Sequence, residues 1–218
     1  MKKILLFATI FVAGYSAAFA QDDKYTAAML PKVIAVDTSH TTADLVALSA
    51  SFERIGDAEK TKWLPYYYAA LAEVNAAYMM NLSKPDASKT DPMADKAETL
   101  LSKAEALTAN NSEIFVIKKM IARLRMTADP MSRYMKYGPI AEEALQTAMK
   151  LNPENPRVYL LQAEDKYFTP EQFGGSKTEA KILFETANKK YDAFKPASSL
   201  DPNWGRGTTQ YFLGQLNK

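Results

Sequence analysis

The chain has 218 residues, of which 27 are basic and 25 acidic, with one histidine and no cysteine. A formal charge of +2 gives no electrostatic reason to expect nucleic acid or an anionic membrane surface as a partner. Without cysteine, disulfides, thiolate nucleophiles and lipid attachment through cysteine are excluded, and a single histidine excludes zinc sites built from several histidines.

Residues 1–20 have the features of a signal peptide. Two lysines precede an apolar stretch over residues 4–13, and Ala18 and Ala20 supply the small residues that a signal peptidase requires. About ten apolar residues are too few to span a bilayer, which needs roughly 20. We therefore expect cleavage before Gln21 and export, to the periplasm or as a secreted protein, with no lipoprotein anchor and no integral membrane segment in the mature chain.

The remainder is predicted to be one all-α domain, because apolar residues recur at intervals of three and four and no alternating β-branched run occurs. The first helix is expected to end at the polar segment 37–42, and the second near Gly56. A third helix begins near Trp63, with Pro65 tolerated in its first turn. The polar, proline-containing segment 83–91 is predicted to be a loop.

A short sequence motif then recurs along the chain. The pattern Ala-x3-Leu-x2-Ala occupies residues 97–104 and returns at 141–148, and a third copy with phenylalanine at its centre spans 180–187. Small residues at both ends allow a neighbouring helix to approach closely, and the large middle residue fills the gap between helix pairs. This spacing resembles the second helix of the tetratricopeptide repeat (TPR), whose standard unit has about 34 residues.

The resemblance implies an all-α, right-handed stack of antiparallel helix pairs, a TPR-like α-solenoid. Residues 21–218 would form a single helical-repeat domain, in which 21–90 are degenerate N-terminal helix pairs, 91–200 the TPR-like repeats and 201–218 a C-terminal cap. The copies are more widely spaced than the standard unit, so loops must be inserted between helices. The proline- and glycine-containing segments 127–132 and 168–177 are the predicted insertions.

Tetratricopeptide-repeat proteins, which this pattern resembles, bind peptides or protein segments in a concave groove lined by the first helix of each pair. The implied function is an exported, non-catalytic interaction module with a protein or peptide partner. The groove residues expected from the resemblance are Phe115, Lys118, Lys119, Ala122 and Arg123 on one helix, and Tyr159, Gln162 and Lys166 on the next. Lys119 and Arg123 share a face and could grip a carboxylate, although a solvated basic face is the simpler interpretation.

A second function remains open, a periplasmic small-molecule or glycan-binding helical protein that is accessory to a hydrolase. It would use aromatic residues near Trp63, Tyr67 and Trp204. The adjacent Tyr66, Tyr67 and Tyr68 fan over roughly 200° of a helix, so core packing is their expected use. No cofactor, metal site or catalytic residue is expected, since His40 lies in a polar turn and no G-x-S-x-G elbow occurs.

Overall fold

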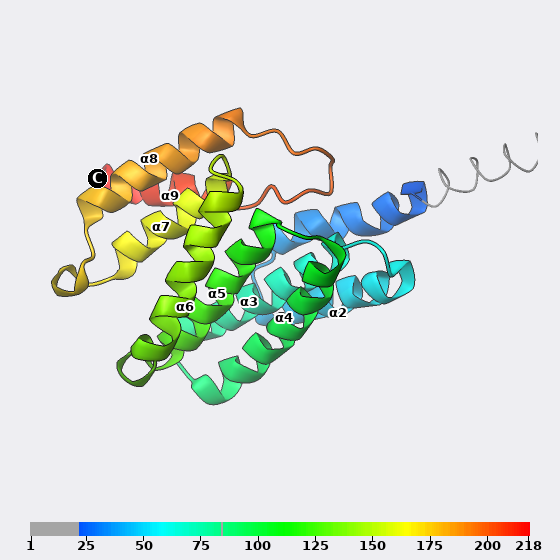
Figure 1. Ribbon diagram of the computed structural model, residues 1–218, viewed down its shortest axis with the longest axis horizontal. Coiled ribbons are helices and arrows are strands. Elements are labelled where there is room, and N and C mark those ends of the chain that lie inside the picture. The colour runs from blue at the N-terminus through cyan, green and yellow to red at the C-terminus, as the bar shows by residue number, and fades with distance from the viewer. Residues whose placement is uncertain (1–21, 84) are drawn as a thin grey trace, which may run out of the picture.

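The computed structural model describes residues 22–83 and 85–218, which are helical apart from short connections. Figure 1 shows consecutive helices running back and forth beside one another in a stack. No strand occurs in these two ranges, so the predicted all-α fold is confirmed. The predicted signal peptide, residues 1–20, lies outside the described residues.

The helices form successive pairs. After a first helix over residues 22–38, the chain forms α2 (Thr42–Glu59), α3 (Leu64–Ser83), α4 (Ala87–Leu107), α5 (Ser112–Ala128), α6 (Pro130–Leu151), α7 (Pro156–Phe168), the short 3-10 helix η1 (Glu171–Phe173), α8 (Lys177–Ala193) and α9 (Arg206–Leu216). Helix α3 packs on α4, α5 on α6 and α7 on α8, while α2 covers α3 and α9 covers α8. The last helix packs on α8, and its predicted role as a cap of the stack stays a prediction.

Capping residues set most of the helix starts. Six helices begin directly after a side chain that accepts a hydrogen bond from a backbone N–H of the first turn, namely Thr41, Asp86, Asn111, Asp129, Asn155 and Ser176. Pro130 and Pro156 stand first in their helices, where a missing N–H is tolerated. These caps allow the chain to reverse within a few residues, which keeps the paired helices close.

Two predicted loops are wrong for the same reason. Most of the segment 83–91 is helical because Asp86 caps α4, and residues 87–91 lie in the first turns of that helix. The segment 127–132 holds only Asp129 between α5 and α6. The third predicted connection, 168–177, is confirmed as the link between α7 and α8.

The recurring sequence motif lies on equivalent helices. Its copies at 97–104, 141–148 and 180–187 fall on α4, α6 and α8, each the second member of a pair. All nine defining side chains are buried. The small residues therefore lie where helices pack closely, as the pattern predicts.

Helix α3 runs through the centre of the core and is buried along most of its length. Tyr66, Tyr67 and Tyr68 are all buried, which confirms their predicted packing role. The Tyr68 hydroxyl donates to the carbonyl of Leu200 at 2.8 Å. Burial raises the pKa of Tyr67 well above its ordinary value, so its hydroxyl keeps the proton that it donates to Glu113 at 3.0 Å.

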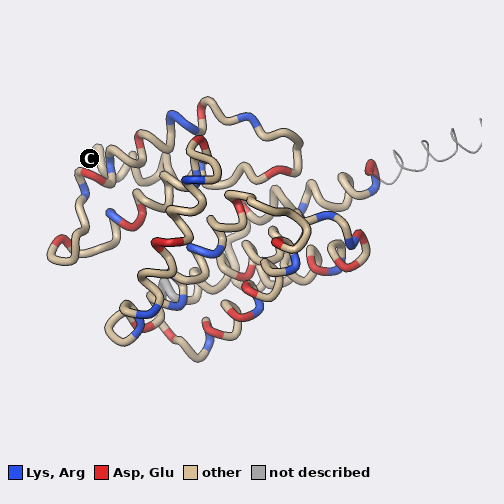
Figure 2. Tube along the Cα trace, viewed as in Figure 1, with Lys and Arg blue, Asp and Glu red and all other residues tan. Residues whose placement is uncertain are grey.

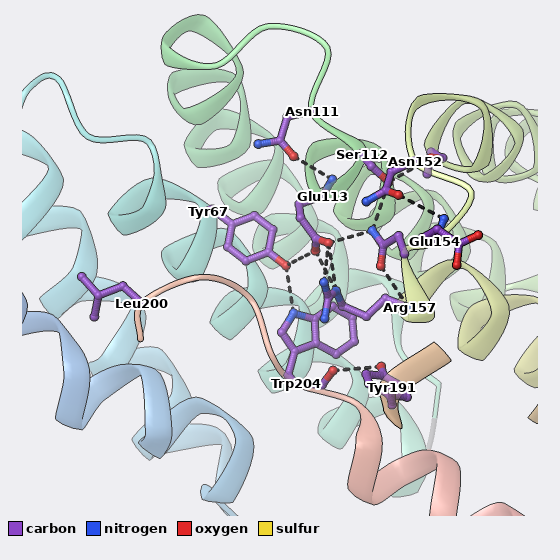
Figure 3. A network of polar contacts seen from close by, with 12 residues as sticks. Tyr67, Asn111, Ser112, Glu113, Asn152, Glu154, Arg157, Tyr191, Leu200 and Trp204 are labelled. Atoms are coloured by element: carbon purple, nitrogen blue, oxygen red, sulfur yellow. Dashed lines mark hydrogen bonds and ion pairs between the residues drawn. The ribbon is translucent and has the colours of Figure 1, made fainter. Parts of the chain in front are cut away.

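A buried ion pair joins three pairs of helices (Figure 3). Glu113 at the start of α5 accepts hydrogen bonds from Arg157 at the start of α7, with Nη2 at 2.6 Å and Nε at 2.9 Å. The same carboxylate accepts from Tyr67 of α3 and from the Asn155 amide at 2.7 Å. Both charged side chains are buried, so each is the main compensation for the other's loss of water.

The segment 194–205, which we call the C-terminal strap, closes over this pair. Figure 1 shows it running from α8 back toward the first helices before it enters α9. Leu200 packs in the core of the N-terminal helices, and the Trp204 indole donates to the Tyr67 hydroxyl at 2.8 Å. Gly205 ends the strap at φ 97°, where an added Cβ would lie 2.4 Å from the Tyr191 hydroxyl. The strap therefore ties the last helices of the stack to the first.

Replacing Glu113 by glutamine tests this ion pair. Glu113→Gln keeps the shape of the side chain but leaves the Arg157 charge buried without its counterion. We expect the free energy of unfolding to fall by about 3–5 kcal/mol, measured by urea denaturation. The control is Glu154→Gln, which breaks an ion pair with Lys190 in which the Glu154 side chain is 77% exposed. It should cost at most about 1 kcal/mol, and equal small losses in both variants would contradict a dominant role for the buried pair.

Candidate functional site

A cavity of about 400 Å³ lies between α4, α5 and α6, and we call it the central groove. Its floor is α5, and its two walls are α4 and α6. The lining residues are Phe115, Lys118, Ile121, Ala122 and Arg125 from α5, Glu98, Leu101, Ser102 and Glu105 from α4, and Tyr137, Ile140, Glu143, Ala144 and Thr147 from α6. Of the residues predicted from sequence, Phe115, Lys118 and Ala122 line this groove.

The floor follows from helical periodicity. Phe115, Lys118, Ala122 and Arg125 are spaced by three, four and three residues, which places them on one face of α5. Alanine at position 122 leaves room above the helix. The result is an apolar floor with one cation at each end.

Both cations of the groove already hold ion pairs. Lys118 Nζ lies 2.6 Å from Glu105 Oε1 and 4.8 Å from the centre of the Phe115 ring. Arg125 Nη2 lies 2.8 Å from Glu98 Oε2 and 2.7 Å from Asp95 Oδ1. These acids all come from α4, so the ion pairs cross from the wall of the groove to its floor.

A further ion pair holds the other wall. Near the start of α6, Arg133 donates to Asp91 of α4 through Nη1 at 2.7 Å and Nη2 at 2.8 Å. This two-bond arrangement restricts the angle between α6 and α4. It therefore sets the width of the groove at the end where α6 begins.

The remaining groove candidates on α5 face α7 instead of the groove. Lys119 Nζ lies 2.7 Å from Asp165, and Arg123 Nη1 lies 2.6 Å from Glu164, both on α7. The Lys119 side chain is only 1% exposed, and burial together with the neighbouring Arg123 lowers its pKa. These two cations bind carboxylates of this chain, and a role toward an outside carboxylate remains a prediction.

The candidates on α7 lie apart from the central groove. The Tyr159 hydroxyl donates to the carbonyl of Pro153 at 2.9 Å, and Lys166 pairs with Glu179 at 2.6 Å. Gln162 is half-buried on the same helix. None of the three lines the cavity, and their part in partner binding is untested.

Of the aromatic residues of the alternative function, Tyr67 is buried, and Trp63 and Trp204 are partly buried against the core. The rings of Trp63 and Tyr67 meet edge to face at 5.4 Å, and Trp204 is bonded to the Tyr67 hydroxyl. Their neighbours are the buried Glu113 and Arg157. They belong to the network beneath the strap, where Trp204 contacts both Tyr67 and Arg157.

No model of a known protein family matches the chain, and no curated protein matches it significantly. Among solved structures, the chain is similar to the HusA haemophore from Porphyromonas gingivalis. The two are 34% identical, with a TM-score of 0.77, over 88% of this chain and 92% of that chain. The chain belongs to the HusA family. This similarity extends over almost the whole of the neighbour.

Three further features of the described residues bear on this HusA-family chain. No group of three or more His, Asp or Glu side chains in the described ranges could hold a metal ion. None of the helices in those ranges is both long and apolar enough to cross a membrane. Figure 2 shows basic and acidic residues interspersed along the helices rather than gathered in one region.

Sequence reasoning missed several groove residues. Arg125 was within reach, because continuing the row from Phe115 through Lys118 and Ala122 leads directly to it. Tyr137 and Glu105 carry no such signal, since they reach the groove only through the packing of α6 and α4 on α5. The sequence pattern marks the floor of the groove but not its walls.

Acid should weaken the Arg133–Asp91 pair that sets the width of the groove. Hydrogen bonds from Arg133 hold the pKa of Asp91 below its ordinary value, so the pair stabilises the fold above about pH 4 and is lost as the pH falls through the folded-state pKa. We expect Asp91→Asn to lower the free energy of unfolding at pH 7 by under about 1 kcal/mol. The difference from the unchanged protein should narrow below about pH 4.

Urea denaturation at pH 7 and pH 3 measures this difference, and Arg133→Gln provides the control. Combined with Asp91→Asn, it should add little at pH 7, because the pair is already broken. Additive losses, or a difference that stays constant with pH, would contradict the assignment.

Proposed function

We propose that this protein is an exported, non-catalytic carrier that binds haem or a related tetrapyrrole in the central groove. The observation that carries the proposal is the 34% identity to the HusA haemophore over 92% of that chain. A haemophore is a carrier and not an enzyme, which agrees with the non-catalytic role that the sequence predicts.

The chemistry of the groove supports this ligand class. Its volume of about 400 Å³ falls within the range of roughly 300–1,000 Å³ that is usual for small-molecule sites. Ile121 and Ala122 offer an apolar surface to a flat macrocycle, and Phe115 offers a ring for packing. Lys118 and Arg125 supply cations for the two propionate groups that haem carries.

The groove limits how the iron could be held. Protein ligands of haem iron are histidine, cysteine, methionine and tyrosine. The chain has no cysteine, and its one histidine, His40, lies in the turn before α2. Among the lining residues only Tyr137 belongs to these ligand types. In this proposal the macrocycle and its carboxylates carry most of the affinity, and Tyr137 is the candidate iron ligand.

Two finer features complete the proposal. The signal-peptide pattern over residues 1–20 supports export, with periplasmic residence or secretion to follow. The three copies of the Ala-x3-Leu/Phe-x2-Ala motif on α4, α6 and α8 support a divergent TPR-like, right-handed arrangement of the helix pairs.

A peptide partner is the second candidate, and it would compete for the same groove. Phe115 and Lys118, which the TPR resemblance assigns to a peptide site, both line the central groove. The two candidates make different demands. A porphyrin needs one flat apolar site, whereas a peptide would extend beyond it along α5.

Filling the groove tests the carrier function. We expect purified protein to bind haemin and metal-free porphyrin, detected by changes in porphyrin absorbance. Thr147→Trp places a large ring in the groove from α6. It should lower the affinity for both ligands at least tenfold, which is about 1.4 kcal/mol of binding free energy. The matched control is Thr186→Trp on α8, since both threonines are half-buried and donate to the carbonyl four residues earlier.

The same titrations report on iron. Loss of affinity for haemin but not for metal-free porphyrin in Tyr137→Phe would identify Tyr137 as the iron ligand. Failure of the unchanged protein to bind either porphyrin, or equal binding by both tryptophan variants, would contradict the proposed site.

A further inference from the structure

The central groove holds its two cations at a fixed separation. Lys118 and Arg125 are seven residues apart on one face of α5, which is about 10 Å along the helix axis. Ile121 and Ala122 lie between them and form the apolar floor. A ligand that lies on this floor with two carboxylates on its edge would bring an anion toward each cation.

Carboxylates of the protein now occupy both cations. Glu105 Oε1 lies 2.6 Å from Lys118 Nζ, and Glu98 Oε2 lies 2.8 Å from Arg125 Nη2. Both glutamates line the groove, and their side chains are 41% and 66% exposed. Ion pairs with this much solvent contact are weak, so a glutamate can rotate into water at little cost.

Each cation also keeps a second partner that would not have to leave. The Lys118 ammonium lies 4.8 Å from the centre of the Phe115 ring, which attracts it independently of Glu105. Arg125 also donates a hydrogen bond to Asp95 at 2.7 Å, and Asp95 does not line the groove. If Glu105 and Glu98 rotate away, both cations stay in position and gain room for another anion.

We propose that Glu105 and Glu98 are internal substitutes for the two carboxylates of the ligand, and that binding exchanges each glutamate for one ligand carboxylate. This inference rests on the proposed carrier function and specifies the ligand class as a flat, apolar dicarboxylate. The glutamates keep Lys118 and Arg125 ordered when no ligand is bound. They also compete with the ligand for the two cations. A ligand without carboxylates gains nothing by displacing them, because it has no anion to offer Lys118 or Arg125.

Removing the competitors should strengthen binding of the diacid. In Glu105→Gln and Glu98→Gln, each cation is free of one carboxylate, so we expect the affinity for deuteroporphyrin IX to rise about two- to fivefold in each variant. The affinity for its dimethyl ester, which has the same macrocycle and no free carboxylate, should stay unchanged. Absorbance or fluorescence titration of the full protein measures both affinities.

The matched control is Glu143→Gln. Glu143 lines the same groove and carries the same charge, but it forms no ion pair with Lys118 or Arg125. Exchange predicts no gain in this variant, whereas a general reduction of negative charge predicts the same gain as in the other two. In addition, Lys118→Gln should weaken diacid binding and abolish the gain from Glu105→Gln when the two are combined.

The outcomes separate this inference from the function on which it rests. Diacid binding by the unchanged protein, with no gain in Glu105→Gln and Glu98→Gln or an equal gain in Glu143→Gln, would overturn the exchange and leave the carrier function intact. An equal gain for the dimethyl ester would overturn it as well. Binding of neither porphyrin by the unchanged protein would overturn the carrier function itself.

Discussion

The buried pair of Glu113 and Arg157 is the interaction on which the arrangement of the helices depends. Two opposite charges that have both lost water must stay together, because separating them leaves each one uncompensated in the interior. Glu113 is the second residue of α5 and Arg157 the second of α7, so the pair joins the starts of two helices through residues 44 apart in the chain. Tyr67 donates to the same carboxylate and adds α3 to the arrangement.

The strap extends this constraint to both ends of the stack. In an open array of helix pairs each unit contacts only its neighbours, and the two ends are independent. Here Trp204 is bonded to Tyr67, and Leu200 packs among the N-terminal helices, so the last helices and the first are held together. Helix α5, which forms the floor of the central groove, is joined to this arrangement at its start through Glu113, which accepts from both Tyr67 and Arg157.

The parts of this fold that could be predicted are those with a local signal. The spacing of Ala97, Leu101 and Ala104 depends only on helical geometry, and its copies mark the second helix of each pair. Polar segments misled the prediction, because a residue such as Asp129 is as suited to capping a helix as to forming a loop. The partners of Lys119 and Arg123 were beyond reach, since Glu164 and Asp165 lie more than 40 residues away in sequence and meet them only after the helices pack.

The two faces of α5 show how one helix can carry both structural and binding charges. Successive residues point about 100° apart, so Lys118 and Lys119 face different neighbours although they are adjacent in sequence. Lys119, at 1% exposure, pairs with an acid of α7, and breaking a buried pair costs several kcal/mol.

Lys118, at 37% exposure, pairs with an acid of α4, and an exposed pair is worth about 1 kcal/mol or less. A ligand's carboxylate can replace the acid in an exposed pair such as that of Lys118, because breaking that pair costs little. It cannot replace the acid of the buried Lys119 pair, because breaking that pair costs several kcal/mol. The depth of burial therefore separates Lys119, which holds the fold together, from Lys118, which remains available to the proposed ligand.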